Sequence, residues 1–139
     1  MRPVSVVIIT KNEADNIRNA LESVQWADDI IVVDSGSTDD TVQIAQQFTD
    51  RVVSHKWAGY GAQKNYGASL AAHDWILSLD ADERVSSTLA EEIRLMLKNE
   101  APARGYRMPR VTHYLGPVSY THLRAHETRH DLVCRLLLE

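Results

Sequence analysis

The sequence lacks several features that mark particular protein classes. It has a single cysteine, Cys134, among 139 residues, so it cannot form an internal disulfide framework. No apolar run approaches the ~20 residues that a membrane-spanning helix needs. The first residues make a poor secretory signal, because the apolar stretch stops at Ile9 and polar residues follow. Together these absences favour a soluble, cytoplasmic protein.

Long basic runs are missing as well, and the formal net charge is −4 at neutral pH. Proteins that bind nucleic acid usually carry a basic patch, so we expect no nucleic-acid partner. A chain of 139 residues has the length of one domain with one core of ordinary size.

The most informative segment is residues 75–83, Trp-Ile-Leu-Ser-Leu-Asp-Ala-Asp-Glu. Its apolar first half has the length of a buried strand. Three acids follow at once, Asp80, Asp82 and Glu83, and acids so close together repel one another unless a positive charge lies between them. Hard oxygen ligands suit Mg²⁺ or Mn²⁺, which also hold phosphates. The segment therefore predicts a metal site that binds a diphosphate.

Residues 1–116 alternate between short apolar runs and helical patterns. The apolar runs predict strands at residues 4–9, 30–33, 52–53, 75–79 and 105–110. The helical patterns predict helices that begin with Asn12 as a cap, with a Ser37–Asp40 capping box, near residue 62, and at Ser86 or Ser87. Continuous apolar strands that alternate with helices are typical of an α/β fold whose mostly parallel sheet is covered on both faces.

Polar clusters follow three of the predicted strands. They are residues 10–13 (Thr-Lys-Asn-Glu), 34–37 (Asp-Ser-Gly-Ser) and 80–83 (Asp-Ala-Asp-Glu). In parallel sheets, ligands bind at the carboxyl ends of the strands. We therefore expect the three clusters to lie together and to form one site.

Other polar and aromatic residues nearby have ordinary structural explanations. Asp39 and Asp40 are expected to act in helix capping rather than as ligands, and Lys11 to be a solvated charge. Trp57 is expected in the core or at a rim, with coverage of a ligand as the alternative. For Glu83, support of a metal site and simple surface exposure both stay open.

Four segments occur in a characteristic order: 6–13 (Val-Val-Ile-Ile-Thr-Lys-Asn-Glu), 31–39 (Ile-Val-Val-Asp-Ser-Gly-Ser-Thr-Asp), 63–67 (Gln-Lys-Asn-Tyr-Gly) and 79–82 (Leu-Asp-Ala-Asp). Together they resemble the family 2 glycosyltransferases with the GT-A fold, over residues 4 to about 115. Segments 10–13 and 79–84 are further similar to bacterial lipopolysaccharide inner-core glucosyltransferases.

The resemblance implies a truncated, Rossmann-like GT-A domain that binds a nucleotide diphosphate sugar, usually UDP-linked. By resemblance, the donor would contact six residues: Thr10, Asn12, Glu13, Asp34, Lys64 and Asp80. Asp34 would accept hydrogen bonds from the uracil, and Lys64 would reach a phosphate or the base. Asp82 would coordinate Mn²⁺ or Mg²⁺ directly.

The implied reaction is sugar transfer to a glycan or glycolipid acceptor with inversion of configuration. The metal would offset the charge that develops on the departing UDP. The resemblance also requires a carboxylate base, which we expect beyond residue 116. It implies a cytoplasmic enzyme that can work at the inner face of the bacterial membrane.

Residues 117–139 do not share the rhythm of residues 1–116. Segments 117–127 and 132–139 resemble a translated sequencing-adapter tail. We therefore expect residues 1–116 to be the nucleotide-sugar-binding half of a GT-A domain and residues 117–139 to be non-native. The alternative is an ordinary C-terminal helix.

Three other functions are alternatives to glycosyl transfer. Residues 126–130 (His-Glu-Thr-Arg-His) match the zinc metalloprotease motif, but Arg129 would place a cation near the zinc and no apolar helix frames the motif. A sugar-phosphate nucleotidyltransferase would need glycines in segment 10–13, which has none. A nucleotide-binding fragment without catalytic activity stays open.

Overall fold

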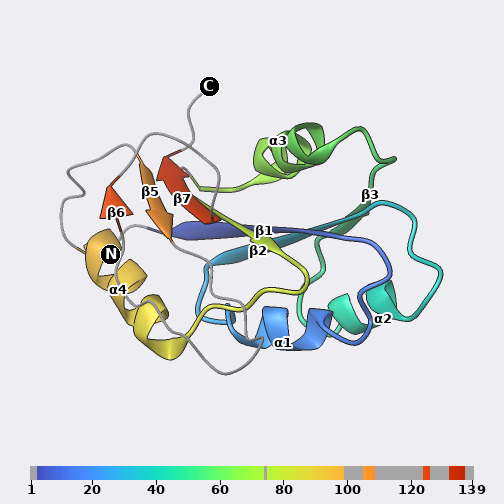
Figure 1. Ribbon diagram of the computed structural model, residues 1–139, viewed down its shortest axis with the longest axis horizontal. Helices are drawn as coiled ribbons and strands as arrows, with labels where there is room; N and C mark the ends of the chain where they lie inside the picture. The colour runs from blue at the N-terminus through green and yellow to red at the C-terminus, as the bar shows by residue number, and fades with distance from the viewer. Residues whose placement is uncertain (1–2, 74, 99–104, 109–123, 126–131, 137–139) are drawn as a thin grey trace, which may run out of the picture.

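One sheet with helices on both faces organises the computed structural model, which describes residues 3–73, 75–98, 105–108, 124–125 and 132–136 (Figure 1). The strand order is β3-β2-β1-β4-β7-β5-β6. The strands are β1 (Val4–Thr10), β2 (Asp29–Asp34), β3 (Val52–Ser54), β4 (Trp75–Asp80), β5 (Gly105–Met108), β6 (Arg124–Ala125) and β7 (Leu132–Leu136). The helices are α1 (Ile17–Glu22), α2 (Thr41–Ala45), α3 (Tyr60–Leu70) and α4 (Ser87–Lys98).

Strands β3, β2, β1 and β4 are parallel, as the alternating pattern predicts. Each runs one residue beyond its predicted apolar run and ends at Thr10, Asp34, Ser54 or Asp80. The ladder continues there because the neighbouring strand still supplies backbone hydrogen-bond partners after the side chains become polar. Thr10 lies opposite Asp34, and Ile9 lies opposite Asp80, so the polar clusters meet at one edge of the sheet.

The rest of the sheet is antiparallel, which the pattern does not predict. β7 pairs with β4 and β5, and β5 pairs with β6. Residues 132–136 form a strand, so the alternative of a C-terminal helix is wrong for them. The His-Glu-Thr-Arg-His motif at 126–130 lies outside the described residues, and the foreign origin of residues 117–139 stays a prediction.

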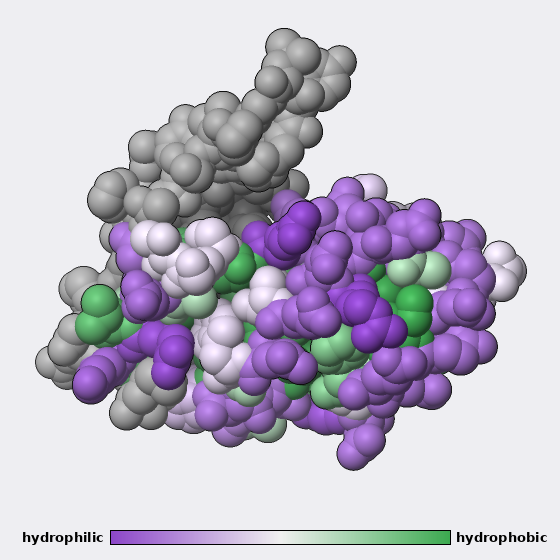
Figure 2. Space-filling view, turned by 90° about the horizontal axis from the view of Figure 1, so that it is seen from below, coloured by the Kyte–Doolittle hydropathy of each residue, from purple (hydrophilic) through white to green (hydrophobic). Residues whose placement is uncertain are grey.

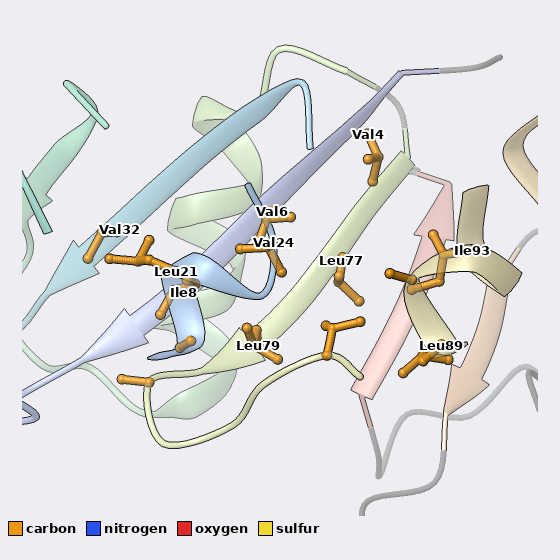
Figure 3. Packing of buried hydrophobic residues seen from close by; sticks show 14 of the residues in the cluster. Val4, Val6, Ile8, Leu21, Val24, Val32, Leu77, Leu79, Leu89 and Ile93 are labelled. Atoms are coloured by element: carbon orange, nitrogen blue, oxygen red, sulfur yellow. The ribbon is translucent and has the colours of Figure 1, made fainter. Parts of the chain in front are cut away.

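The two faces of the parallel strands pack against different helices. On one face, Val6, Ile8 and Leu77 pack with buried side chains of α1 and α4 (Figure 3). On the other face, Val7 and Val33 pack with side chains of α3. Because both faces are covered, every residue of β1 is buried. This double burial explains why the strand sequences are continuously apolar.

The surface on the side of α1 and α2 is mostly hydrophilic, with small hydrophobic areas between polar residues (Figure 2). Within the described ranges, no helix has both the length and the apolar character that crossing a membrane requires.

Two of the predicted helix caps are wrong. Asn12 does not cap α1, which begins at Ile17; instead Asn12 takes a left-handed conformation with φ of 53° and bonds to the following loop. Ser37 does not form a capping box with Asp40, because its hydroxyl donates to Asp34. The capping groups are engaged elsewhere: the Asn12 side chain accepts the Thr38 backbone N–H, and the Ser37 hydroxyl bonds to Asp34 within its own turn.

Helices α3 and α4 lie close to their predicted ranges. α3 begins at residue 60, two residues earlier than expected. The Ser86 hydroxyl accepts the backbone N–H of Leu89 at 3.1 Å, so it caps α4 as predicted. Leu89, Ile93 and Leu97 are buried on one side of α4.

Asp29 fastens the edge of the sheet opposite to the polar clusters. Its carboxylate accepts hydrogen bonds from the Ser5 hydroxyl and the Ala72 N–H, each at 2.9 Å, and pairs with the Arg51 guanidinium at 2.7 Å. Burial raises the pKa of Asp29, but these three donors outweigh burial and hold the pKa below its ordinary value of 3.8. One side chain thus joins β1, β2 and the segments that lead into β3 and β4.

Helix α3 comes closest to the sheet at Gly67. A Cβ at this buried position would lie 2.3 Å from Val7 Cγ1 and 3.2 Å from Val33 Cγ2. Gly61, in the first turn of the same helix, would place its Cβ in open space. The sequence therefore needs glycine at residue 67 to seat α3 on the sheet, but not at residue 61.

We expect Gly67→Ala to lower the free energy of unfolding by about 1–3 kcal/mol, because the added methyl group displaces Val7. Gly61→Ala is the matched control and should be neutral or stabilise by up to about 1 kcal/mol, since alanine favours helix. Urea unfolding of both variants measures the difference. Equal unfolding free energies would contradict the close approach of α3.

We expect Asp29→Asn to lower the free energy of unfolding at neutral pH by about 1.5–3 kcal/mol, the worth of hydrogen bonds to a charged group. Because the folded pKa of Asp29 is depressed, this contribution is present above its ordinary pKa of 3.8 and is lost as the pH falls through the lower folded value. Wild type and variant should therefore converge in stability below that pH. Asp50→Asn, at an exposed position, is the control; a constant difference between wild type and Asp29→Asn at all pH values would refute this account.

Candidate active site

A cavity of about 450 Å³ opens at the carboxyl ends of the parallel strands. Its volume is typical of sites for small molecules and cofactors. The wall comes from the ends of β1, β2 and β4 and from the segment that joins β3 to α3. It carries three acids, one buried hydroxyl and two aromatic rings: Glu13, Asp80, Asp82, Thr10, Trp57 and Tyr60.

The cavity brings together part of the predicted set of site residues. Four of the seven line it: Thr10, Glu13, Asp80 and Asp82. Three do not: Asn12, Asp34 and Lys64. The strand-end argument therefore locates the cavity, whereas the ligand role of each residue stays a prediction.

Asp34 is buried and closes its own turn. Its Oδ2 accepts the backbone N–H groups of Gly36 at 3.0 Å and Ser37 at 2.9 Å, and its Oδ1 accepts the Ser37 hydroxyl. Gly36 has a φ of 106°, which favours glycine at this point of the turn. A carboxylate has about four acceptor positions, so these bonds use most of its capacity. Ser35, rather than Asp34, reaches the cavity wall.

The loops after β1 and β2 are locked to each other. Asn12 donates its N–H to the Ser37 hydroxyl and accepts the Thr38 N–H at Oδ1, both at 2.7 Å. Glu13 donates its N–H to the Thr41 hydroxyl at 2.8 Å. These bonds hold the backbone of Glu13, whose side chain lines the cavity. Asn12 therefore supports the wall from outside.

Asp39 joins the same two loops at the surface. Its carboxylate accepts the Ala14 N–H at 3.2 Å, together with the N–H and the hydroxyl of Thr41. The Thr41 hydroxyl lowers the pKa of Asp39 below its ordinary value, against a smaller opposing effect of desolvation. Asp40 occupies the N-cap position of α2, although its side chain makes no capping hydrogen bond. Asp39 thus bonds to the first residue of α2, in line with the expected role in helix capping, whereas the expected side-chain cap from Asp40 is wrong.

β4 ends in a turn that presents Asp82. Glu83 donates its N–H to the carbonyl of Asp80 at 3.0 Å, and its Oε1 accepts the Asp80 N–H at 2.8 Å. Asp82, between them, is exposed on the cavity wall. Of the two alternatives for Glu83, the geometry favours support of the carboxylate turn over simple surface exposure.

Thr10 carries a buried hydroxyl that lacks a hydrogen-bond partner in the described structure and is therefore a candidate for binding a ligand. The residue is 6% exposed and lines the cavity. Its Oγ1 has no hydrogen-bond partner among the residues that the structure describes. Leaving a buried hydroxyl unpaired costs about 1–3 kcal/mol. A ligand that bonds to Thr10 would remove this cost.

The wall carries more negative than positive charge. Glu13, Asp80 and Asp82 face the cavity together with Lys11. A diphosphate would be repelled by this wall unless a divalent cation lay between them. In the described ranges, no group of three or more His, Cys, Asp or Glu side chains could hold a metal by itself. The donor set fits Mg²⁺ or Mn²⁺, which typically use one or two carboxylates plus phosphate oxygens and water.

Gln63 contributes to the cavity wall, although the sequence pattern does not single it out. This residue is fully buried on the cavity wall. Its Oε1 accepts from His55 Nδ1 at 2.5 Å, and its Nε2 donates to the His55 carbonyl at 3.3 Å. Gln63 is the first residue of segment 63–67, which carries the family resemblance, although the resemblance implies a contact with the donor only for Lys64. Lys64 is half-buried on α3 and lies off the wall.

The sequence pattern of one family, described as Glycosyl transferase family 2, matches residues 5–130. An uncharacterized glycosyltransferase of Rickettsia felis is 51% identical over 94 residues, which are 67% of this chain and 33% of the relative. The lipopolysaccharide core biosynthesis glycosyltransferase LpsC of Rhizobium meliloti is 32% identical over 132 residues, 91% of this chain and 48% of LpsC. The chain thus spans a third to a half of the length of these relatives.

Solved structures show the same fold. Glucosyl-3-phosphoglycerate synthase from Mycobacterium tuberculosis, in complex with Mn²⁺, UDP and glucosyl-3-phosphoglycerate, is 25% identical with a TM-score of 0.63, over 75% of this chain and 42% of that one. S. aureus TarS 1-349 is 23% identical with a TM-score of 0.64, over 74% and 34%, and supports the fold alone. The predicted GT-A fold is confirmed. The family match and the identity to LpsC together show that this chain belongs to glycosyl transferase family 2.

Proposed function

We propose that this chain provides the donor site of a metal-dependent glycosyltransferase that uses a UDP-sugar. The observation that carries the proposal is the convergence of Thr10, Glu13, Asp80 and Asp82 on one cavity at the carboxyl ends of parallel strands. Membership of glycosyl transferase family 2 indicates that the reaction served by this site is the transfer of a sugar. The mycobacterial synthase, bound to Mn²⁺ and UDP, supports the choice of metal and nucleotide.

Each wall residue has a distinct part in this proposal. Asp82 holds Mn²⁺ or Mg²⁺ together with the diphosphate, and the ion supplies positive charge that offsets the charge developing on UDP as it leaves. Thr10 and Glu13 bond to the ribose or the base, and Asp80 contacts the ribose. Asp34 serves mainly by shaping the turn that presents Ser35.

The acceptor is inferred from a single relative. LpsC is named for lipopolysaccharide core biosynthesis, so we infer a glycan of that kind as the acceptor. We assign no catalytic base among the described residues, and we keep the prediction that the base lies beyond residue 116. A fragment that binds the donor without catalysis is the second candidate; release of UDP from a UDP-sugar would exclude it.

We expect Asp82→Asn to remove the metal-dependent part of UDP binding. A ligand at 100 times its dissociation constant stabilises the folded form by about 2.7 kcal/mol. Thermal unfolding of the chain with UDP, with and without Mn²⁺, should therefore show a Mn²⁺-dependent rise in the midpoint for the wild type and none for Asp82→Asn. Glu91→Gln, an exposed acid on α4, is the control. An unfolding midpoint of the wild type that does not change with UDP and Mn²⁺ would refute the proposed donor site.

We expect Thr10→Val to separate binding from stability. Valine has nearly the same shape but no hydroxyl, and the hydroxyl of Thr10 has no partner within the described part of the chain. The free energy of unfolding without ligand should therefore be unchanged or raised by up to about 1 kcal/mol, whereas UDP affinity should fall roughly 5- to 10-fold with the loss of one hydrogen bond. Urea unfolding and a UDP titration measure the two quantities. A destabilised Thr10→Val with full affinity would contradict a ligand role.

A further inference from the structure

Two exposed aromatic side chains lie on the wall of the cavity, beside its acidic and hydroxyl groups. Trp57 is 47% exposed and Tyr60 is 67% exposed, and both line the cavity. Their rings meet edge to face at 90°, with centroids 4.9 Å apart. Large aromatic rings left in water at a ligand site indicate a contact with a flat or apolar part of the ligand.

The aromatic pair, Trp57 and Tyr60, rests on a fixed base. Tyr60 begins α3, and Gln63, one turn later, is fully buried and bonded to His55 at both ends of its amide. His55 also stacks on Tyr66 at 4.0 Å and donates its N–H to the Asp34 carbonyl at 2.9 Å. The segment between β3 and α3 is therefore held at both ends, so the aromatic pair is presented before any ligand binds.

The strand order indicates which part of a ligand reaches the pair. Asp82 follows β4, whereas Trp57 and Tyr60 follow β3, and β2 and β1 lie between these strands. Strands in a sheet are ~4.8 Å apart, so the ends of β4 and β3 are about 14 Å apart along the edge of the sheet. A ligand held at Asp82 by its diphosphate must therefore extend across two strands before it touches the aromatic pair.

Only one end of a nucleotide sugar can reach the aromatic pair while its diphosphate is held at Asp82. The sugar is bonded directly to the diphosphate, so it stays near Asp82. The nucleobase is separated from the diphosphate by the ribose, and the polar groups of Thr10, Glu13 and Ser35 lie between the two ends of the site. A planar base also stacks well on aromatic side chains.

We propose that Trp57 and Tyr60 form the surface on which the nucleobase of the donor stacks. The proposal rests on the proposed donor site, which it deepens. It assigns to the aromatic pair a role in binding that is separate from the metal and the diphosphate.

The test compares two probes on the whole chain, UDP with Mn²⁺ and inorganic pyrophosphate with Mn²⁺. Trp57→Ala and Tyr60→Ala should weaken UDP about 5- to 150-fold, the range for loss of one stacked base, and leave pyrophosphate unchanged. Tyr60→Phe should keep the affinity for UDP, because it keeps the ring. Leu95→Ala, at an exposed apolar residue of α4 away from the wall, is the matched control.

Tryptophan fluorescence gives a direct readout that does not depend on the stability of the alanine variants. The chain has three tryptophans, Trp26, Trp57 and Trp75. UDP with Mn²⁺ should quench the emission of the wild type, and Trp57→Phe should abolish the quenching while UDP still binds. Unchanged UDP affinity in both alanine variants, or an equal loss for UDP and pyrophosphate, would overturn the stacking role. Failure of the wild type to bind either probe would instead overturn the proposed donor site itself.

Discussion

The register of the parallel strands is the constraint on which the rest of the site depends. Backbone pairing sets Thr10 opposite Asp34 and Ile9 opposite Asp80, so three polar clusters reach the same edge of the sheet. A shift of one residue in β4 would turn every side chain of that strand to the other face. Burial on both faces penalises such a shift, because Leu77 and Leu79 would exchange places with Ile76 and Ser78. Packing in the core thus fixes the geometry of the cavity.

The polar residues at this edge fall into two groups: those whose side chains bond to the protein and shape the site, and those whose side chains remain available to a ligand. The side chains of Asp34, Asn12 and Asp39 form hydrogen bonds within turns or with the neighbouring loop. Thr10 keeps a buried hydroxyl without a partner in the described structure, and Asp82 keeps an exposed carboxylate. Satisfied groups stabilise the loops, while the buried Thr10 hydroxyl costs stability when no ligand is bound. This division is what a preformed binding site requires.

The sequence predicts the parallel strands well. It predicts poorly which polar residues form hydrogen bonds within the structure and which remain available to a ligand. Strands buried on both faces read as continuous apolar runs, so β1 to β4 and their polar ends could be located. The partners of Asn12 lie about 25 residues away, and no local pattern distinguishes a helix cap from a bond to that loop. Gln63 was missed for a similar reason, since its burial follows from the way Gly67 seats α3 on the sheet. Of the antiparallel strands, β5 lies within the strand predicted at residues 105–110, whereas β6 and β7 belong to residues 117–139, which do not share the strand–helix alternation of residues 1–116.

The distribution of chemistry along the edge limits what can occupy the site. The end at β4 carries carboxylates and therefore needs a cation before it can accept an anion, whereas the end at β3 carries aromatic rings and no acid on the wall. A simple phosphate would bind, through a cation, only at the end near β4. A free sugar has no anionic group that a cation could hold there. A ligand that uses the whole cavity combines an anionic part with a planar part. A nucleoside diphosphate with a bound cation combines these two parts, so the arrangement of the cavity wall supports the proposed nucleotide-linked donor.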